Sequence, residues 1–172
     1  MPTHATILSN ANTADVVADA VDTYLAGSSV TVGTRIKVGT RIIWKLAVTK
    51  TAAGIVAPIF NVRFGTAGTV ADAARHTFTG VAQTAATDVG MIEIMCVVRS
   101  VSATGTTSSI FNFEHFNAIT GFADKAQAQI IQSTSAAYDN TAAGLIAGLS
   151  VIPGTLGVWT FQVVSVDVTN LV

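Results

Sequence analysis

Three histidines and one cysteine are the residues whose side chains could take part in nucleophilic catalysis. They are His4, His76, His115 and Cys96. Such catalysis needs a nucleophile, a base within hydrogen-bond reach and a group that orients the base. His115 follows Glu114 in an alternating run, so their side chains point to opposite faces of a strand and form no dyad. We therefore expect structural histidines at positions 76 and 115, and a small core residue at Cys96.

The acidic residues offer two further arrangements that could do chemistry. Asp15, Asp19 and Asp22 would share one face if their segment were helical, which would make either a weak cation site or a solvated face. Glu93 and Glu114 lie on two alternating runs, and a hairpin would set them roughly opposite each other. Two carboxylates at a suitable separation carry out glycoside hydrolysis. We expect the solvated face, no glycosidase pair, and no catalytic, cofactor-binding or metal-binding residue.

A glycine-rich stretch between two alternating runs is the remaining candidate for chemistry. It reads FNVRFGTAGTVADAARHTFTG, from Phe60 to Gly80. A phosphate-binding Walker loop has the pattern G-x-x-x-x-G-K-[ST] and opens a helix. Here Gly65 and Gly68 are followed by no such lysine and by no long helical pattern. The stretch therefore predicts a strand, a turn and a second strand rather than a phosphate site.

The chain carries little charge for its length. Of its 172 residues 11% are charged, nine basic and ten acidic, whereas ordinary soluble domains have about 25%. Alanine and threonine together supply 51 residues, so much of the surface must be small and weakly polar. Small side chains lose little rotamer entropy on burial, and interface cores are depleted in charge. The composition favours a protein that assembles with other proteins over the alternative, a monomer with a threonine-rich exterior.

Charge distribution and hydropathy argue against two classes of partner. No basic cluster is present that would neutralise phosphates, so we expect no binding to nucleic acid. An uncharged stretch runs from Asn140 to Val166, but Pro153 and four glycines interrupt it. A membrane-spanning helix needs about 20 continuous apolar residues. We therefore expect two strands and a turn there, and no membrane contact.

Alternating apolar residues dominate the pattern, which is typical of half-buried strands. The five strongest runs are RIIWKLAVTK, PIFNVRFG, MIEIMCVVRSV, SIFNFEHF and VWTFQVVSVDV. One face of the first run carries Ile42, Trp44, Leu46 and Val48. In the last run, one face carries Trp159, Phe161 and Val163, and the other includes Val164, Val166 and Val168. We expect both tryptophans in the core.

About eight or nine such strands, without a βαβ rhythm, predict an all-β fold with little helix. We expect an antiparallel β-sandwich, and a jelly roll among the sandwiches. Residues 33–172 would form this domain, and residues 1–32 an N-terminal arm or a first strand. Within the latter segment, the pattern of residues 13–25 fits a helix and a strand equally well.

Two long stretches resemble small β-rich structural proteins of tailed bacteriophages. The first is WKLAVTKTAAGIVAPIFNVRFGTAGTVADAARHTFTG, followed by AQTAATDVGMIEIMCVVRSV, and the second is GFADKAQAQIIQSTSAAYDNTAAGLIAGLSV. The resemblance covers most of the chain after about Tyr24. It implies a virion component with a β-sandwich domain, often trimeric and exposed on the capsid or the tail. It carries no catalytic residue onto this sequence.

From this resemblance and the composition we expect a non-enzymatic capsid decoration (cement) protein. It would be made in the host cytoplasm, form homotrimers and bind the major capsid protein or other virion proteins on the capsid surface, without a cofactor. Residues 1–32 would reach a neighbour. Because arginine is enriched at interfaces, the candidate contacts are Arg35, Arg41, Arg63, Arg75 and Arg99. The alternative is a tail-fibre or tail-tip jelly roll that binds a receptor or glycan on the host surface.

Overall fold

The computed structural model describes residues 3–9, 20–51, 54–115, 130–156 and 158–171, and these form an all-β fold. The strands and the single 3-10 helix of these ranges are β1 Thr3–Ser9, β2 Thr23–Tyr24, β3 Val30–Thr31, η1 Gly33–Arg35, β4 Arg41–Thr51, β5 Ile59–Gly65, β6 Ala73–Thr79, β7 Asp88–Ser100, β8 Thr106–His115, β9 Ile130–Thr134, β10 Ile146–Ile152 and β11 Val158–Leu171. The eleven strands exceed the predicted eight or nine, partly because β2 and β3 have two residues each and leave no alternating pattern.

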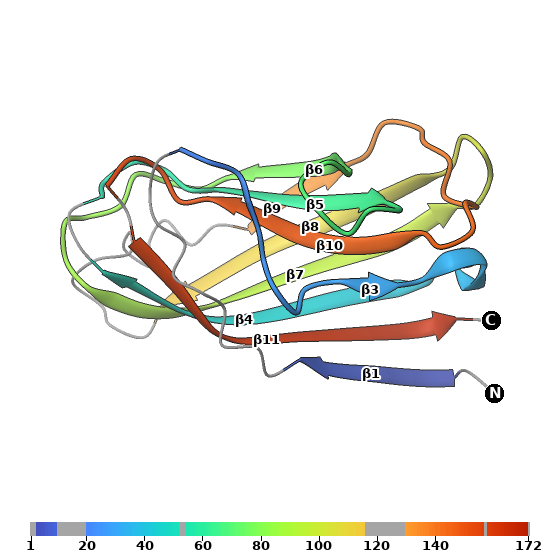
Figure 1. Cartoon of the computed structure of the whole chain (residues 1–172), viewed down its shortest axis with the longest axis horizontal. Helices are drawn as coiled ribbons and strands as arrows, with labels where there is room; N and C mark the ends of the chain where they lie inside the picture. The colour runs from blue at the N-terminus through green and yellow to red at the C-terminus, as the bar shows by residue number, and fades with distance from the viewer. Residues whose placement is uncertain (1–2, 10–19, 52–53, 116–129, 157, 172) are drawn as a thin grey trace.

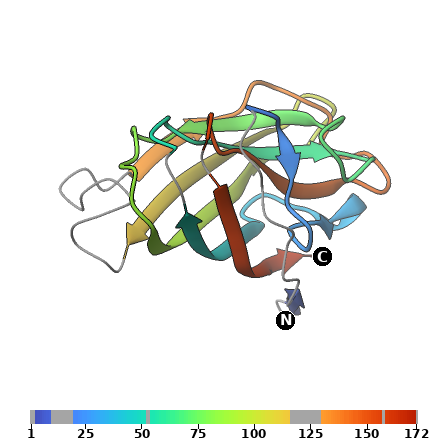
Figure 2. The ribbon, with the colours of Figure 1, turned by 60° about the vertical axis from the view of Figure 1, so that its left-hand side comes forward.

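The strands form two antiparallel sheets that pack as a β-sandwich (Figure 1, Figure 2). Sheet A has six strands in the order β1-β11-β4-β7-β8-β9. Sheet B has the order β2-β10-β5-β6, with β3 also paired to β10. The predicted antiparallel sandwich is confirmed, and the finer assignment to a jelly roll stays a prediction. The two central strands of sheet A are β4 and β7.

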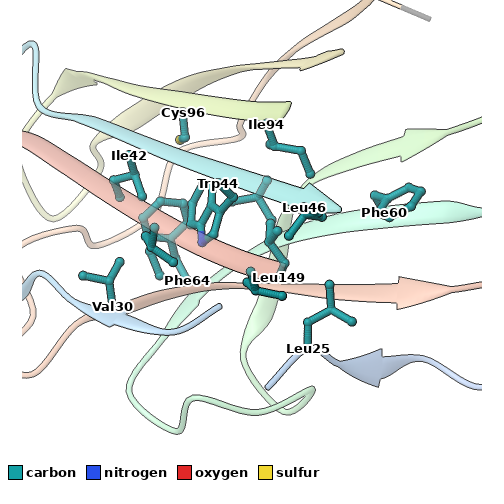
Figure 3. Packing of buried hydrophobic residues seen from close by; sticks show 14 of the residues in the cluster. Leu25, Val30, Ile42, Trp44, Leu46, Phe60, Phe64, Ile94, Cys96 and Leu149 are labelled. Carbon is teal, nitrogen blue, oxygen red and sulfur yellow. The ribbon is translucent and has the colours of Figure 1, made fainter. Parts of the chain in front are cut away.

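The core lies between the sheets and takes one face of each. Ile42, Trp44, Leu46 and Val48 are all buried, as the alternation of β4 predicts. Trp44 of sheet A and Phe64 of sheet B are both buried in the core between the sheets (Figure 3). The indole of Trp44 also donates a hydrogen bond to the Ser28 carbonyl oxygen at 2.8 Å, which satisfies its only polar atom. Both tryptophans are fully buried, as predicted.

Strand β11 departs from the predicted alternation. Trp159 and Phe161 are buried, and the valines that follow them are buried as well, namely Val164, Val166 and Val168. The pairing of β11 with β4 shifts register between Phe161 and Val163. Such a bulge adds one residue to the strand, so the side chains beyond it return to the core face. The prediction that these three valines oppose Trp159 is therefore wrong.

The segment 1–32 contributes to both sheets. β1 lies at the edge of sheet A, where it pairs with β11 from Thr3 opposite Leu171 to Ser9 opposite Val164. β2 and β3 pair with β10 in sheet B. Of the stretch 13–25, Thr23 and Tyr24 form a strand, and residues 13–19 lie outside the described ranges.

The uncharged C-terminal stretch forms strands, as predicted. It contains β10 and the first half of β11, joined by a turn in which Gly154 has φ of 84°. Glycine adopts this left-handed conformation without the strain that a Cβ would add. In the described ranges, no helix is long and apolar enough to cross a membrane.

Candidate functional site

The glycine-rich turn between β5 and β6 binds a carboxylate of its own chain. The side chain of Asp72 accepts hydrogen bonds from the backbone N–H of Ala67 at 3.0 Å and of Gly68 at 2.7 Å. A Cβ added at Gly65 would lie 2.1 Å from Asp72 Oδ1, so a larger residue there would displace the carboxylate. Two backbone donors that an anion would need are thus already occupied. The predicted strand, turn and strand are confirmed.

A polar cluster, in which Asn61, Arg63 and Ser150 are buried, lies on the outer face of sheet B, away from the core. We call it the Arg63 cluster, and its members are Asp22, Asn61, Arg63, Thr77 and Ser150. The Arg63 guanidinium pairs with the Asp22 carboxylate and donates a hydrogen bond to Ser150 Oγ at 2.7 Å. It also donates to the carbonyl oxygens of Val70, at 3.0 Å, and Asp72. Asn61 accepts a hydrogen bond from Thr77 Oγ1 at 2.8 Å. The arrangement is a structural network within one chain, in which Asp22 Oδ1 is buried without a hydrogen-bond partner.

The segment that contains β2 helps to cover this outer face. Tyr24 lies over Gly148, where an added Cβ would come within 1.8 Å of the tyrosine hydroxyl oxygen. Asp22, two residues earlier, is held by Arg63. This contact contradicts the solvated face predicted for Asp22, while Asp15 and Asp19 lie outside the described residues. In the part of the chain that the structure describes, no group of acidic, histidine and cysteine residues could hold a metal ion.

His76 lies between the two sheets, beside β8 and β9. Its Nε2 is 2.8 Å from Thr107 Oγ1, and its Nδ1 is 3.2 Å from Ser133 Oγ. Because the ring is buried, its pKa is lowered to about 4, so the imidazole is neutral near pH 7. These contacts fit the structural role predicted for His76. The side chains of His4 and His115 lie outside the described part of the structure.

Cys96 is fully buried on the core face of β7. Its Sγ lies 4.0 Å from His76 Nε2, the closest approach of a thiol and a base in the described chain. Burial raises the pKa of the thiol to about 12. A thiol that stays protonated and is shielded from solvent is a poor nucleophile. The pair therefore has the residue types of a cysteine–histidine dyad, but its thiol stays protonated and its imidazole stays neutral. Cys96 occupies the core, as expected.

Lys50 was missed as a structural residue. It is fully buried at a core-facing position of β4, in phase with Trp44 and Val48. Its ammonium donates hydrogen bonds to the carbonyl oxygens of Thr84 at 2.6 Å and Ala86 at 3.1 Å, and burial lowers its pKa. The lysine thereby fixes the loop between β6 and β7. The available signal was a charged residue on the apolar face of an alternating run.

The predicted pairing of the two glutamates is wrong. Glu93 lies opposite Asn112, and Glu114 lies opposite Met91, one rung further along the β7–β8 hairpin. The β7–β8 pairing also shifts register between Val98 and Ser100, beside the loop in which the Gly105 N–H donates a hydrogen bond to the Ser102 carbonyl oxygen. Glu93 instead faces Lys45 across the β4–β7 pair, with Nζ and Oε2 3.9 Å apart.

The outer face of sheet A is open, unlike that of sheet B. We call open face the outward residues of its three strands β4, β7 and β8: Arg41, Ile43, Lys45, Ala47, Thr49, Val89, Met91, Glu93, Met95, Val97, Arg99, Ser108, Ile110 and Asn112. All of them are partly or fully exposed, including 45% of Val89 and 41% of Met91. Apolar and small side chains thus dominate a face on which no described element packs.

A small hollow lies near the middle of the open face. Its volume is about 110 Å³, and it is lined by Lys45, Met91, Glu93 and Asn112. The four residues come from β4, β7 and β8 and occupy neighbouring rungs, Lys45 opposite Glu93 and Glu93 opposite Asn112. The hollow therefore combines an apolar wall with a carboxylate and an amide, groups that suit a side chain of mixed character. Sequence reasoning did not find it, since it depends on the register of three strands.

Two of the five arginines predicted as contacts are used within the chain. Arg63 belongs to the buried Arg63 cluster, and the guanidinium carbon of Arg75 lies 4.5 Å above the centre of the Tyr138 ring. Their charges are committed to the fold, which makes them weaker candidates for a partner.

The other three predicted arginines are exposed. Arg41 and Arg99 lie on the open face, and Arg35, in η1, donates a hydrogen bond to the Thr31 carbonyl oxygen at 2.9 Å. Arg41 stands opposite Val97 in the register, so Arg41 and Arg99 lie at the same end of the open face. These two remain available to a partner of this face.

Known proteins add no assignment to this geometry. No protein-family model matches the chain, and no curated protein sequence matches it.

Proposed function

We propose that this chain is a non-enzymatic structural protein of a tailed bacteriophage virion, a capsid decoration protein that binds the outside of the shell and stabilises it. The observation that carries the proposal is the open face of sheet A. It is broad, half of its outward residues are apolar and no described element packs on it, and exposed apolar patches of this kind mark sites of contact with other proteins. The resemblance of the sequence to phage structural proteins supplies the biological setting.

The interior of the sandwich supports a structural rather than a catalytic role. His76 is neutral and hydrogen-bonded to hydroxyls, and the Cys96 thiol is protonated and buried. The Arg63 cluster is closed by its own chain. The described groups that resemble catalytic machinery are therefore used to join parts of the fold.

The aromatic side chains favour decoration over the tail-fibre alternative. Glycan-binding sites commonly present exposed aromatic rings that stack on sugars. Here Trp44 and Trp159 are fully buried, Tyr138 is 5% exposed and Tyr24 is half-buried over Gly148. In the part of the chain whose side chains are described, no aromatic ring is fully exposed.

Copy number in purified virions tests the proposal directly. A decoration protein occupies repeated sites on the shell, so we expect hundreds of copies per particle relative to the major capsid protein. Quantitative densitometry of gels, calibrated with the recombinant chain, measures that ratio. A few dozen copies or fewer would reject decoration and favour a tail component. Particles that lack the protein should also lose genome at a lower temperature than complete particles.

A further inference from the structure

We infer that β9 is a strap at the edge of sheet A, which His76 latches near neutral pH and acid releases. The inference is independent of the proposed function. β9 ends sheet A on the side where β6 ends sheet B, and the two edge strands lie side by side (Figure 1). His76 of β6 reaches across this seam, with its Nδ1 3.2 Å from Ser133 Oγ of β9. This side chain therefore joins the edges of the two sheets.

β9 is attached to the sandwich mainly through its backbone. In the described part of the chain it pairs with β8 alone, over its whole length from Ile130 to Thr134. None of its five residues is buried, and Ile130 is 73% exposed. Its one apolar contact with the core is through the partly buried Ile131. Segments with few buried apolar contacts open at a lower free energy than the whole fold, so β9 can detach while the centre of the sandwich stays closed.

The imidazole of His76 forms the latch in its neutral state. Its Nε2 lies 2.8 Å from Thr107 Oγ1 on β8, and its Nδ1 contacts Ser133 Oγ on β9. A neutral imidazole has one donor and one acceptor nitrogen, and a hydroxyl can serve either of them. The imidazolium has two donors, so both hydroxyls would have to accept and to find other acceptors for their own protons. The contacts of the closed seam therefore fit the neutral ring.

The groups around His76 offer no counterion to a protonated ring. β5 places the apolar Val62 opposite it, and β7 places the protonated Cys96 thiol 4.0 Å from Nε2. Tyr138, in the loop after β9, is buried with a raised pKa, and the cation of Arg75, the neighbour of His76 on β6, lies over its ring. In the part of the chain whose side chains are described, no carboxylate pairs with His76. A proton on the closed ring would thus add a buried, unpaired charge.

Proton linkage gives the direction and the size of the response. Burial lowers the pKa of His76 to about 4 in the closed seam, whereas a histidine exposed to water has a pKa of about 6.5. The open state binds the proton more readily, so the opening equilibrium constant rises as the pH falls below 6.5. Between pH 7 and pH 5 the increase is about 20-fold. Opening uncovers the backbone N–H and C=O groups along β8, an edge that can pair with another strand.

Amide hydrogen exchange of the full recombinant chain, read by mass spectrometry of its peptides, tests the strap. At pH 7 we expect the peptide that covers β9 to be at least about tenfold less protected than the peptide that covers β4. At pH 5, after correction for the intrinsic exchange rate, the protection of β9 should fall by about 20-fold. Equal protection of β4 and β9 would show that β9 opens only with the whole sandwich, and would overturn the strap. Unchanged protection of β9 between the two pH values would overturn the latch.

Two variants test whether His76 and its contact with β9 are responsible. His76→Gln keeps hydrogen-bonding groups but does not titrate, so its β9 peptide should be equally protected at pH 7 and pH 5. Ser133→Ala removes the contact on β9 and should lower the protection of β9 at pH 7 by about threefold or more. Thr134→Ala, the loss of an exposed hydroxyl on the same strand, is the control and should change it less. A 20-fold pH response that persists in His76→Gln, or equal effects of the two β9 variants, would overturn the inference. If His76→Gln does not fold, the wild-type pH comparison and the two β9 variants still decide.

Discussion

The outer faces of the two sheets carry similar residue types but differ in how far those residues are buried. On sheet B, Arg63 and Asn61 alternate with core residues along β5, yet both are buried, because Asp22 and Tyr24 lie against them. On sheet A, Lys45 and Glu93 also alternate with core residues, and their side chains are 51% and 47% exposed. A charged residue at an outward strand position therefore does not by itself mark a surface. Its exposure depends on whether another segment of the chain packs over it.

The difference in burial sets what each ion pair contributes. The side chains of the Arg63–Asp22 pair are 9% and 26% exposed, so the loss of one partner leaves a poorly solvated charge without its counterion. The Lys45–Glu93 pair stays in water, where an exposed ion pair contributes about 0 to 1 kcal/mol. The covered pair stabilises the fold, and the exposed pair contributes little to it.

The largest expected effect comes from breaking the covered face. Arg63→Ala removes the cation from Asp22 and the donor from Ser150, and should lower the free energy of unfolding by about 3–5 kcal/mol. Urea denaturation followed by circular dichroism measures this change. Arg41→Ala, a truncation of the same residue type on the open face, is the control and should change stability by less than about 0.5 kcal/mol. Equal losses in both variants would contradict the contrast between the faces.

A second expected effect comes from the seam between the sheets, at His76. Its pKa is about 4 in the folded chain and about 6.5 when unfolded, so the unfolded state binds the proton more readily. Stability contributed by the neutral ring is complete above pH 6.5 and is lost as the pH falls toward 4. The maximum loss is about 3 kcal/mol. Unfolding free energies measured from pH 8 to pH 4 should show this slope.

The matched variant for this pH dependence is His76→Gln, which retains hydrogen-bonding groups without titrating. We expect its stability to vary less than that of the wild type between pH 6.5 and pH 4. Carboxylates that titrate in the same range affect both proteins, so the difference between the two profiles isolates the histidine. Parallel profiles would show that His76 is protonated in the fold without cost.

A smaller effect should follow from lifting the cover of sheet B. Gly148→Ala places a Cβ within 1.8 Å of the Tyr24 hydroxyl oxygen, which must move. Overpacking of this kind costs about 1–3 kcal/mol, part of which the tyrosine relieves by rotating. Thermal unfolding of Gly148→Ala, Tyr24→Ala and the double variant forms a double-mutant cycle. The double variant should lose less stability than the sum of the two single changes, and strict additivity would argue against the contact.

The smallest effect on folding is expected at the open face. Lys45→Ala removes an ion pair with atoms 3.9 Å apart in solvent and should change the free energy of unfolding by less than about 0.5 kcal/mol. Measured at sub-micromolar concentration, where association does not contribute, chemical denaturation gives this value. A loss of about 2 kcal/mol or more would mean that the open face stabilises the fold of the single chain as the outer face of sheet B does.

The sequence predicted the strands whose alternation is strong and uninterrupted. The core positions of β4 and β7 follow directly from a period of two, as at Trp44 and Ile94. The same rule failed in β11, because the bulge between Phe161 and Val163 lies in a run that is apolar on both faces and gives no local signal. The same rule placed Glu93 opposite Glu114, although the two lie two residues apart in the register. A shift of two residues keeps every side chain on its face, so the alternation of a strand cannot detect it.

The candidate surface was harder to predict than the fold. The low charge of the chain indicated a protein suited to contact with other proteins. The enrichment of arginine at interfaces suggested five arginines as the contact residues. Two of those arginines are engaged by residues that are distant in the sequence: Arg63 pairs with Asp22, and Arg75 lies over the ring of Tyr138. The residues at the middle of the open face, Lys45 and Glu93, lie 48 positions apart and become neighbours only through the pairing of β4 with β7.

The sequence alone determined that this chain forms an antiparallel β-sandwich with a buried tryptophan-containing core and a turn rather than a phosphate site at Gly65–Gly68. These properties depend on the alternation of side chains and on local turn chemistry, and both can be recognised from residues that are adjacent in the sequence. Only the tertiary structure decided which outer face is covered, which charges are buried and which carboxylate fills the glycine turn. Those outcomes depend on register and on the path of residues 20–25, because contacts between distant segments leave no periodic trace in either segment.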